Sequence, residues 1–86
     1  MSLSSSDLRF EVRRHLASRP PASFSLEEIV HGLARKTIEV SKEHVLDALV
    51  YLSGLNPPQV KTPASSVNAV RYQITSAGVV AHENNE

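Results

Sequence analysis

Histidine and cysteine are the residues that most often bind metals or take part in covalent catalysis, and this chain has four histidines and no cysteine. The absence of cysteine excludes thiol catalysis, disulfides and cysteine-based zinc sites. The histidines stand at positions 15, 31, 44 and 82, without the short spacings that place two metal ligands side by side. His31 follows Glu27 by four residues, which is most simply a contact on a helix surface. We therefore expect no metal site.

Serine and glycine show no catalytic arrangement either. The serines gather in the N-terminal tail, at helix starts and in one loop, and none stands in a nucleophile elbow. With three glycines the chain has no glycine-rich phosphate loop. The sequence therefore predicts a protein that is not an enzyme and uses no cofactor.

Length and composition indicate one small domain. A chain of 86 residues with 41% apolar residues can build a single core, although it buries only roughly 60% of its unfolded surface. No apolar run reaches the length of a signal peptide or a membrane span. We expect one cytoplasmic domain over residues 1–86 without a membrane partner. We expect its core to span about residues 6–83 and residues 1–4 and 84–86 to be disordered.

Charge is balanced overall but unevenly distributed. Nine basic and nine acidic residues cancel. Residues 1–36 hold six basic and four acidic residues, whereas residues 37–86 hold three basic and five acidic ones. Nucleic-acid binders are usually more basic, because neutralising phosphates supplies much of their affinity. The balance therefore weighs against nucleic acid as a partner.

A first helix is predicted over residues 7–18, with Ser4 or Ser6 as its cap and Pro20-Pro21 as its end. Three apolar residues at intervals of four form its buried stripe: Leu8, Val12 and Leu16.

The opposite side of this helix carries Phe10 and Ala17 beside Arg13 and Arg14. Two interpretations remain open. Either the rest of the domain surrounds a wide helix, or this side is a self-association surface, since exposed apolar residues need cover. The second interpretation predicts a homodimer. The arginines also offer a surface for an acidic protein partner.

The second helix has the clearest start signal. Ser25-Leu-Glu-Glu28 is a capping box, and Phe24 and Ile29 occupy the positions of a hydrophobic staple. Residues 22–24 before it suit a short strand. One face of this helix is apolar: Leu26, Ile29, Val30, Leu33 and Ala34.

A third helix is predicted over residues 41–53, with Ser41 as its N-cap and Gly54 as its stop. Its apolar face is broad: Val45, Leu46, Leu49, Val50 and Leu52. The face predicted to point outward consists of His44, Asp47, Ala48 and Tyr51, with Glu43 at its edge. This face has no arginine or lysine.

A hairpin and a short helix complete the chain. Residues 59–62 and 70–75 form the predicted arms, and residues 63–69 form a polar, proline-led loop. Residues 76–82 suit a short closing helix, in which Gly78 allows close packing and Val79 or Val80 contacts the core.

From Phe24 to Glu83 the chain resembles the winged helix-turn-helix family of bacterial regulators. The order of the elements carries this resemblance, together with the closing residues Tyr72, Ile74, Thr75 and Gly78. It implies an α+β fold that is mainly α: three helices, a wing hairpin and a short C-terminal helix. It also implies that the third helix enters the major groove of double-stranded DNA while the wing contacts the flanking backbone or minor groove.

Six residues could make those DNA contacts. The N-terminal turn of the third helix supplies hydrogen-bonding groups and a favourable helix dipole, and the hairpin arms supply two cations. They are Ser41, Lys42, His44, Tyr51, Lys61 and Arg71. Asp47 would oppose the phosphates.

Two functions follow from different classes. The first is a sequence-specific DNA-binding protein, a small homodimeric transcriptional regulator that reads DNA with residues 41–53 and the wing at 59–75. The alternative is a winged-helix protein–protein interaction module that does not bind DNA. The resemblance favours DNA, whereas zero net charge and the acidic residues of the third helix favour a protein partner.

Overall fold

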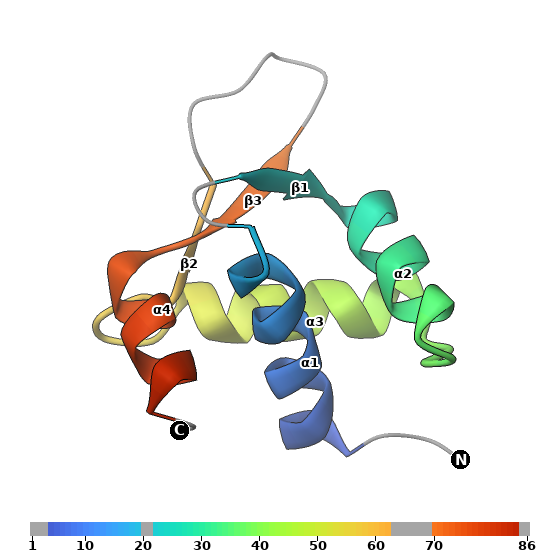
Figure 1. The fold of residues 1–86 in the computed structure, drawn as a ribbon, viewed down its shortest axis with the longest axis horizontal. Helices are drawn as coiled ribbons and strands as arrows, with labels where there is room; N and C mark the ends of the chain where they lie inside the picture. The colour runs from blue at the N-terminus through green and yellow to red at the C-terminus, as the bar shows by residue number, and fades with distance from the viewer. Residues whose placement is uncertain (1–3, 20–21, 63–69, 85–86) are drawn as a thin grey trace.

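The computed structural model describes residues 4–19, 22–62 and 70–84 (Figure 1). These residues form four helices and one three-stranded antiparallel sheet, which confirms the predicted α+β class. The predicted loop at 63–69 lies outside them, as do residues 1–3 and 85–86 of the predicted disordered ends. In chain order the elements are α1 (Ser5–Ala17), β1 (Ser23–Ser25), α2 (Leu26–Arg35), α3 (Lys42–Ser53), β2 (Val60–Lys61), β3 (Arg71–Ile74) and α4 (Ser76–Glu83).

Each helix begins at a hydroxyl cap. The cap oxygen accepts a hydrogen bond from the backbone N–H three residues on, at 3.0–3.3 Å, in Ser4, Ser25, Ser41 and Thr75. The Glu28 carboxylate also accepts from the Ser25 backbone N–H at 2.9 Å, which confirms the capping box. Because Ser4 is the cap, α1 begins at Ser5 rather than at the predicted Asp7.

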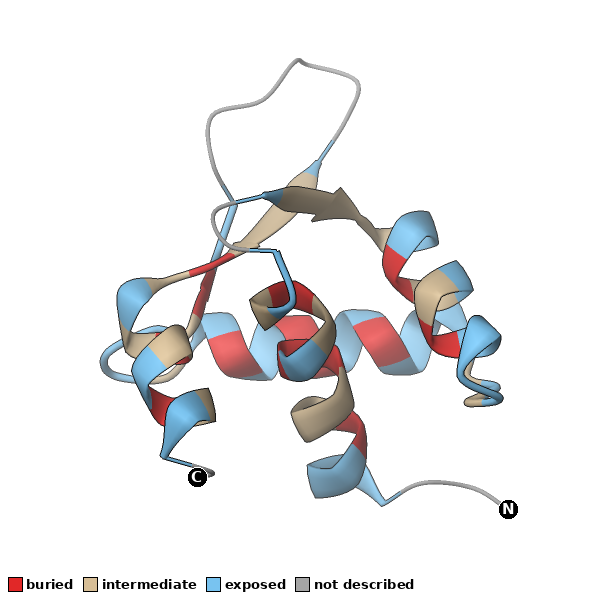
Figure 2. Ribbon diagram, in the orientation of Figure 1, coloured by how far each residue is buried: buried red, intermediate tan, exposed pale blue. Residues whose placement is uncertain are grey.

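The core lies where α1, α2 and α3 meet, as the buried positions in Figure 2 show. In the view of Figure 1, α1 crosses in front of α3, and α2 and α4 stand on either side. Among the described residues, seven side chains are fully buried: Val12, Leu16, Ile29, Leu33, Val45, Leu49 and Val60. The predicted stripe of the first helix is therefore the side that enters the core.

The sheet has the strand order β1-β3-β2, and both pairings are antiparallel. Phe24 of β1 pairs with Tyr72 of β3. Val60 of β2 pairs with Ile74 of β3, and both of these aliphatic side chains are buried in the core. The short strand predicted before the second helix is β1, shifted to Ser23–Ser25. β2 and β3 lie within the two predicted hairpin arms, 59–62 and 70–75, and pair antiparallel, although both strands are shorter than predicted.

Gly78 lets α4 approach the chain just before β2. A Cβ at this position would overlap the backbone carbonyl oxygen of Gln59. That same oxygen accepts the Thr75 N–H at 3.0 Å. Val79 packs against the core while Val80 is 55% exposed, so Val79 makes the predicted core contact.

The predicted faces of the second and third helices are wrong at four positions. Ala34 is exposed, and Ala48, placed outward from the sequence, is buried in the core. Leu46 and Val50, placed in the core, are 39% and 61% exposed. The cause at α3 is the position of α1, because Leu8 and Arg9 lie beside Ala48 and cover that side of the helix.

The side of α1 predicted to face outward is partly covered by its own domain. Arg13 is only 5% exposed, and its Nη1 donates to Gln59 Oε1 at 3.0 Å. Ala17 packs against the core, and the Phe10 ring lies 5.4 Å from the His82 ring of α4. The contacts of Arg13 and Ala17 support the first interpretation, whereas self-association through Phe10 and Arg14 stays a prediction. Arg14 remains exposed beside Glu11.

Candidate interaction surfaces

The outward surface of α3, here called the α3 face, consists of Glu43, Leu46, Asp47, Val50 and Tyr51. All five are exposed, and Figure 2 shows pale blue positions alternating with buried ones along this helix. From Glu43 to Ser53 the helix has no lysine or arginine. The α3 face therefore joins aliphatic groups to two carboxylates.

Three of the predicted DNA-contacting residues lie together where α3 begins. The Ser41 hydroxyl accepts the His44 N–H at 3.3 Å and lies 3.0 Å from His44 Nδ1, so the helix cap occupies it. Lys42 Nζ lies 3.5 Å from Glu27 Oε1. Both partners are exposed, so water screens this pair and Lys42 can exchange Glu27 for another anion.

The Lys42 charge also acts on its partner. The pKa of Glu27 is lowered chiefly by a hydrogen bond from its own backbone N–H and next by Lys42. This carboxylate at the start of α2 stays charged at neutral pH, where it favours the helix dipole.

Tyr51 is joined to α1 rather than free. The guanidinium carbon of Arg9 lies 3.6 Å from the centre of the Tyr51 ring, which is a cation–π contact. Tyr51 remains 47% exposed, so its ring contacts α1 and still forms part of the α3 face. Sequence spacing gave no sign of this contact, because it depends on how α1 crosses α3.

Arg71 has a structural role in the sheet. Its Nε donates to Ser23 Oγ at 2.9 Å and its Nη2 to the Ser23 carbonyl at 2.7 Å. The same Nη2 lies 3.0 Å from Glu28 Oε1. The Ser25 backbone N–H is the largest cause of the lowered pKa of Glu28, and Arg71 adds to it. Arg71 therefore joins β3, β1 and the start of α2.

Lys61 differs from Arg71, although both lie on the hairpin. It is exposed on β2, where it pairs with Gln73, and within the described ranges it makes no ion pair. The six predicted DNA-contacting residues thus divide among three places: the start of α3, its contact with α1, and the sheet.

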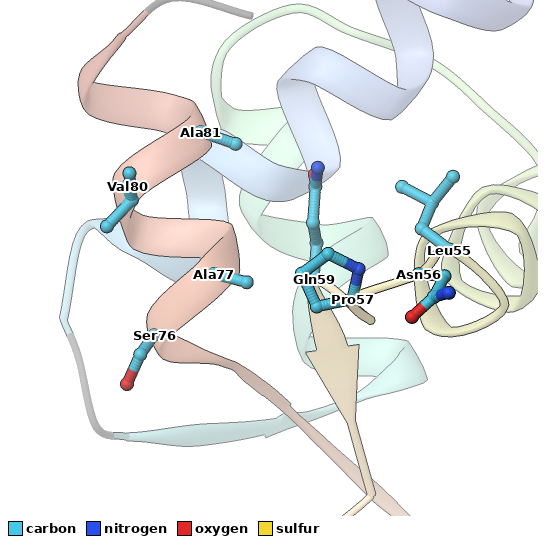
Figure 3. A pocket seen from close by; sticks show the side chains of 8 residues that line it. All are labelled: Leu55, Asn56, Pro57, Gln59, Ser76, Ala77, Val80 and Ala81. Atoms are coloured by element: carbon cyan, nitrogen blue, oxygen red, sulfur yellow. The ribbon is translucent and has the colours of Figure 1, made fainter.

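A hollow of about 490 Å³ lies between α4 and the segment before β2 (Figure 3). Ala77 and Ala81 point from α4 toward Gln59 and Pro57. Its lining has no ionisable side chain: Leu55, Asn56, Pro57, Gln59, Ser76, Ala77, Val80 and Ala81. This hollow offers no group for acid–base catalysis.

Within residues 4–19, 22–62 and 70–84, no three His, Asp or Glu side chains converge to hold a metal ion. None of the helices in these ranges has the length and apolar character needed to cross a membrane. Comparison with protein-family models, curated proteins and solved structures found no match to this chain.

Proposed function

We propose that this protein is a winged-helix interaction module whose α3 face binds an apolar segment of another protein flanked by basic residues. One observation carries the proposal: Leu46 and Val50 are exposed on the same helix face as Glu43 and Asp47. In a DNA-reading helix these positions would meet bases and phosphates.

The aliphatic side chains supply the affinity in this proposal. Covering a Val or Leu side chain completely stabilises a complex by about 1.5–3 kcal/mol, in proportion to the area removed from water. Val50 has the larger exposed fraction, 61%, so it is the residue whose loss weakens binding most. Tyr51 adds an aromatic edge of the kind common at protein interfaces.

In this proposal the two carboxylates of the α3 face determine the specificity for the partner. Glu43 and Asp47 stand four residues apart, on the same side of α3. A partner with Lys or Arg beside its apolar residues is attracted to them, whereas an acidic partner is repelled. A second copy of this chain would place the same carboxylates against each other, so the partner is a different protein.

DNA binding is the second candidate, and the start of α3 favours it. Lys42 and His44 lie exposed at a helix N-terminus, and the Lys42 pairing with Glu27 is open to exchange. Lys61 adds an exposed cation on the hairpin. Against it, Ser41 and Arg71 are engaged within the fold, and Asp47 would face phosphates.

The two candidates are separated by titrating a labelled mixed-sequence duplex and following fluorescence anisotropy at about 50 mM and about 200 mM salt. The interaction module predicts no saturable binding at either concentration. Saturable binding that falls steeply with salt would replace it with the DNA candidate.

Partner chemistry is tested by selecting binders from a random peptide library displayed on phage. We expect the selected peptides to combine aliphatic residues with Lys or Arg. Their affinity for the Val50→Asp variant is expected to be at least ten-fold lower than their affinity for the parent protein. Val80→Asp is the matched control, because Val80 is 55% exposed on α4, away from the α3 face. Equal losses in both variants, or acidic selected peptides, would contradict the proposal.

A further inference from the structure

A second hollow lies between the C-terminal half of α1 and α2, separate from the α3 face. Its volume is about 580 Å³. Both helices and the start of the sheet contribute to its wall: His15, Ser18, Arg19, Phe24, Glu28, His31, Gly32, Arg35 and Lys36. We call it the basic hollow, because three of these residues are permanent cations.

The wall of the basic hollow holds three cationic side chains and one carboxylate, so its net charge is positive. Among the described residues, neither Arg19, Arg35 nor Lys36 takes part in an ion pair. The one carboxylate in the wall, Glu28, already binds Arg71 and the Ser25 N–H. A chain with zero net charge thus gathers three of its nine basic residues around one cavity. The three positive side chains repel one another, and a bound anion would reduce this repulsion.

Two rings in the lining of the basic hollow, His15 and Phe24, contact each other. The His15 ring lies 4.8 Å from the Phe24 ring, tilted by 57°. It also rests directly on Gly32, where any Cβ would overlap the imidazole. Burial is the main cause of the lowered pKa of His15, and Lys36 and Arg35 lower it further against the opposing effect of Glu28. The imidazole is therefore neutral at pH 7, with one N–H to donate.

We propose that the basic hollow binds the phosphate group of a small phosphorylated molecule. Two guanidinium groups and an ammonium match a multiply charged anion with several acceptor oxygens better than a single carboxylate. The cavity is larger than a phosphate ion requires, so the organic part of the ligand has room against Phe24 and His15. Nothing in this site depends on the α3 face.

The test is a ¹H–¹⁵N NMR titration of the whole chain with inorganic pyrophosphate at constant ionic strength. We expect saturable shifts at Gly32, Arg35 and Lys36 and a raised pKa of His15, because a bound anion favours its charged form. The double variant Arg35→Gln/Lys36→Gln is expected to weaken binding at least ten-fold. Both residues are exposed, so the fold remains intact in this variant.

Arg14→Gln/Lys61→Gln is the matched control, since it removes the same charge from exposed positions outside the basic hollow. Equal weakening in both double variants would overturn the proposal, as would shifts that never saturate. A parallel titration with a 20-base-pair duplex identifies the phosphate source. Shifts in the basic hollow with the duplex but not with pyrophosphate would also overturn it.

Discussion

The guanidinium of Arg71 in β3 binds the carboxylate of Glu28 in α2, with Nη2 3.0 Å from Oε1. Glu28 also closes the capping box through the Ser25 N–H, and Arg71 also binds Ser23 in β1. One network therefore joins the hairpin to the first turn of α2. A residue predicted to contact DNA has its donors directed into its own domain.

Arg71→Ala is expected to lower the free energy of unfolding by about 1–2 kcal/mol, because it removes charged hydrogen bonds at a partly exposed site. Lys61→Ala, on the neighbouring strand without such partners, is expected to change it by less than about 0.5 kcal/mol. Urea denaturation measures both. A stable Arg71→Ala protein would show that the network contributes little.

Gly78→Ala tests the close approach of α4. Alanine normally stabilises a helix relative to glycine by about 0.5–1 kcal/mol. Here we expect destabilisation by about 1–3 kcal/mol, because the new methyl group would overlap the Gln59 carbonyl oxygen, which belongs to the backbone. Gly54→Ala is the control, since its Cβ would meet no atom closer than 3.4 Å. Thermal unfolding measures both variants. We expect Gly78→Ala to lower the unfolding temperature and Gly54→Ala to leave it unchanged or raise it.

Ser41 is a helix cap in the structure and a predicted DNA contact from the sequence. Ser41→Ala is expected to cost about 1 kcal/mol of stability, whereas Ser41→Asp retains the cap and favours the helix dipole. Chemical denaturation gives the two values. An aspartate at this position repels phosphate, so duplex affinity that falls in Ser41→Asp while stability holds would support the DNA candidate instead.

Local interactions made much of the fold predictable. The capping box at Ser25, the cap at Ser41 and the stop at Gly54 each depend on residues within a few positions of one another. Alternation around Tyr72 and Ile74 likewise predicted β3, since strand faces repeat every two residues. These signals need no knowledge of the neighbouring elements.

The interaction surfaces could not be predicted in the same way. The periodicity of α3 allowed more than one buried arc, and the crossing of α1 decided that Ala48 is buried and Val50 exposed. The partners of Arg13 and Arg71 lie 46 and 48 positions away in the sequence. Only the tertiary arrangement shows that these arginines are engaged within the domain.

The two partly buried histidines make stability depend on pH. The pKa of His15 and that of His82 are both lowered from 6.5, chiefly by burial and then by nearby cations, Lys36 for His15 and Arg13 for His82. A lowered folded-state pKa means that the unfolded chain binds protons first as the pH falls. Stability is therefore complete above about pH 6.5 and declines below it.

His15→Gln is expected to reduce that decline between pH 7 and pH 5.5, because it removes one of the two groups that resist protonation when folded. Glu27 and Glu28 act in a separate window. Their pKa values are lowered from 4.5, so the stability they contribute is present above that pH and lost below it. Urea denaturation at half-unit pH intervals resolves the two windows. A decline between pH 7 and pH 5.5 that is as steep in His15→Gln as in the parent would show that burial of His15 does not disfavour its charged form.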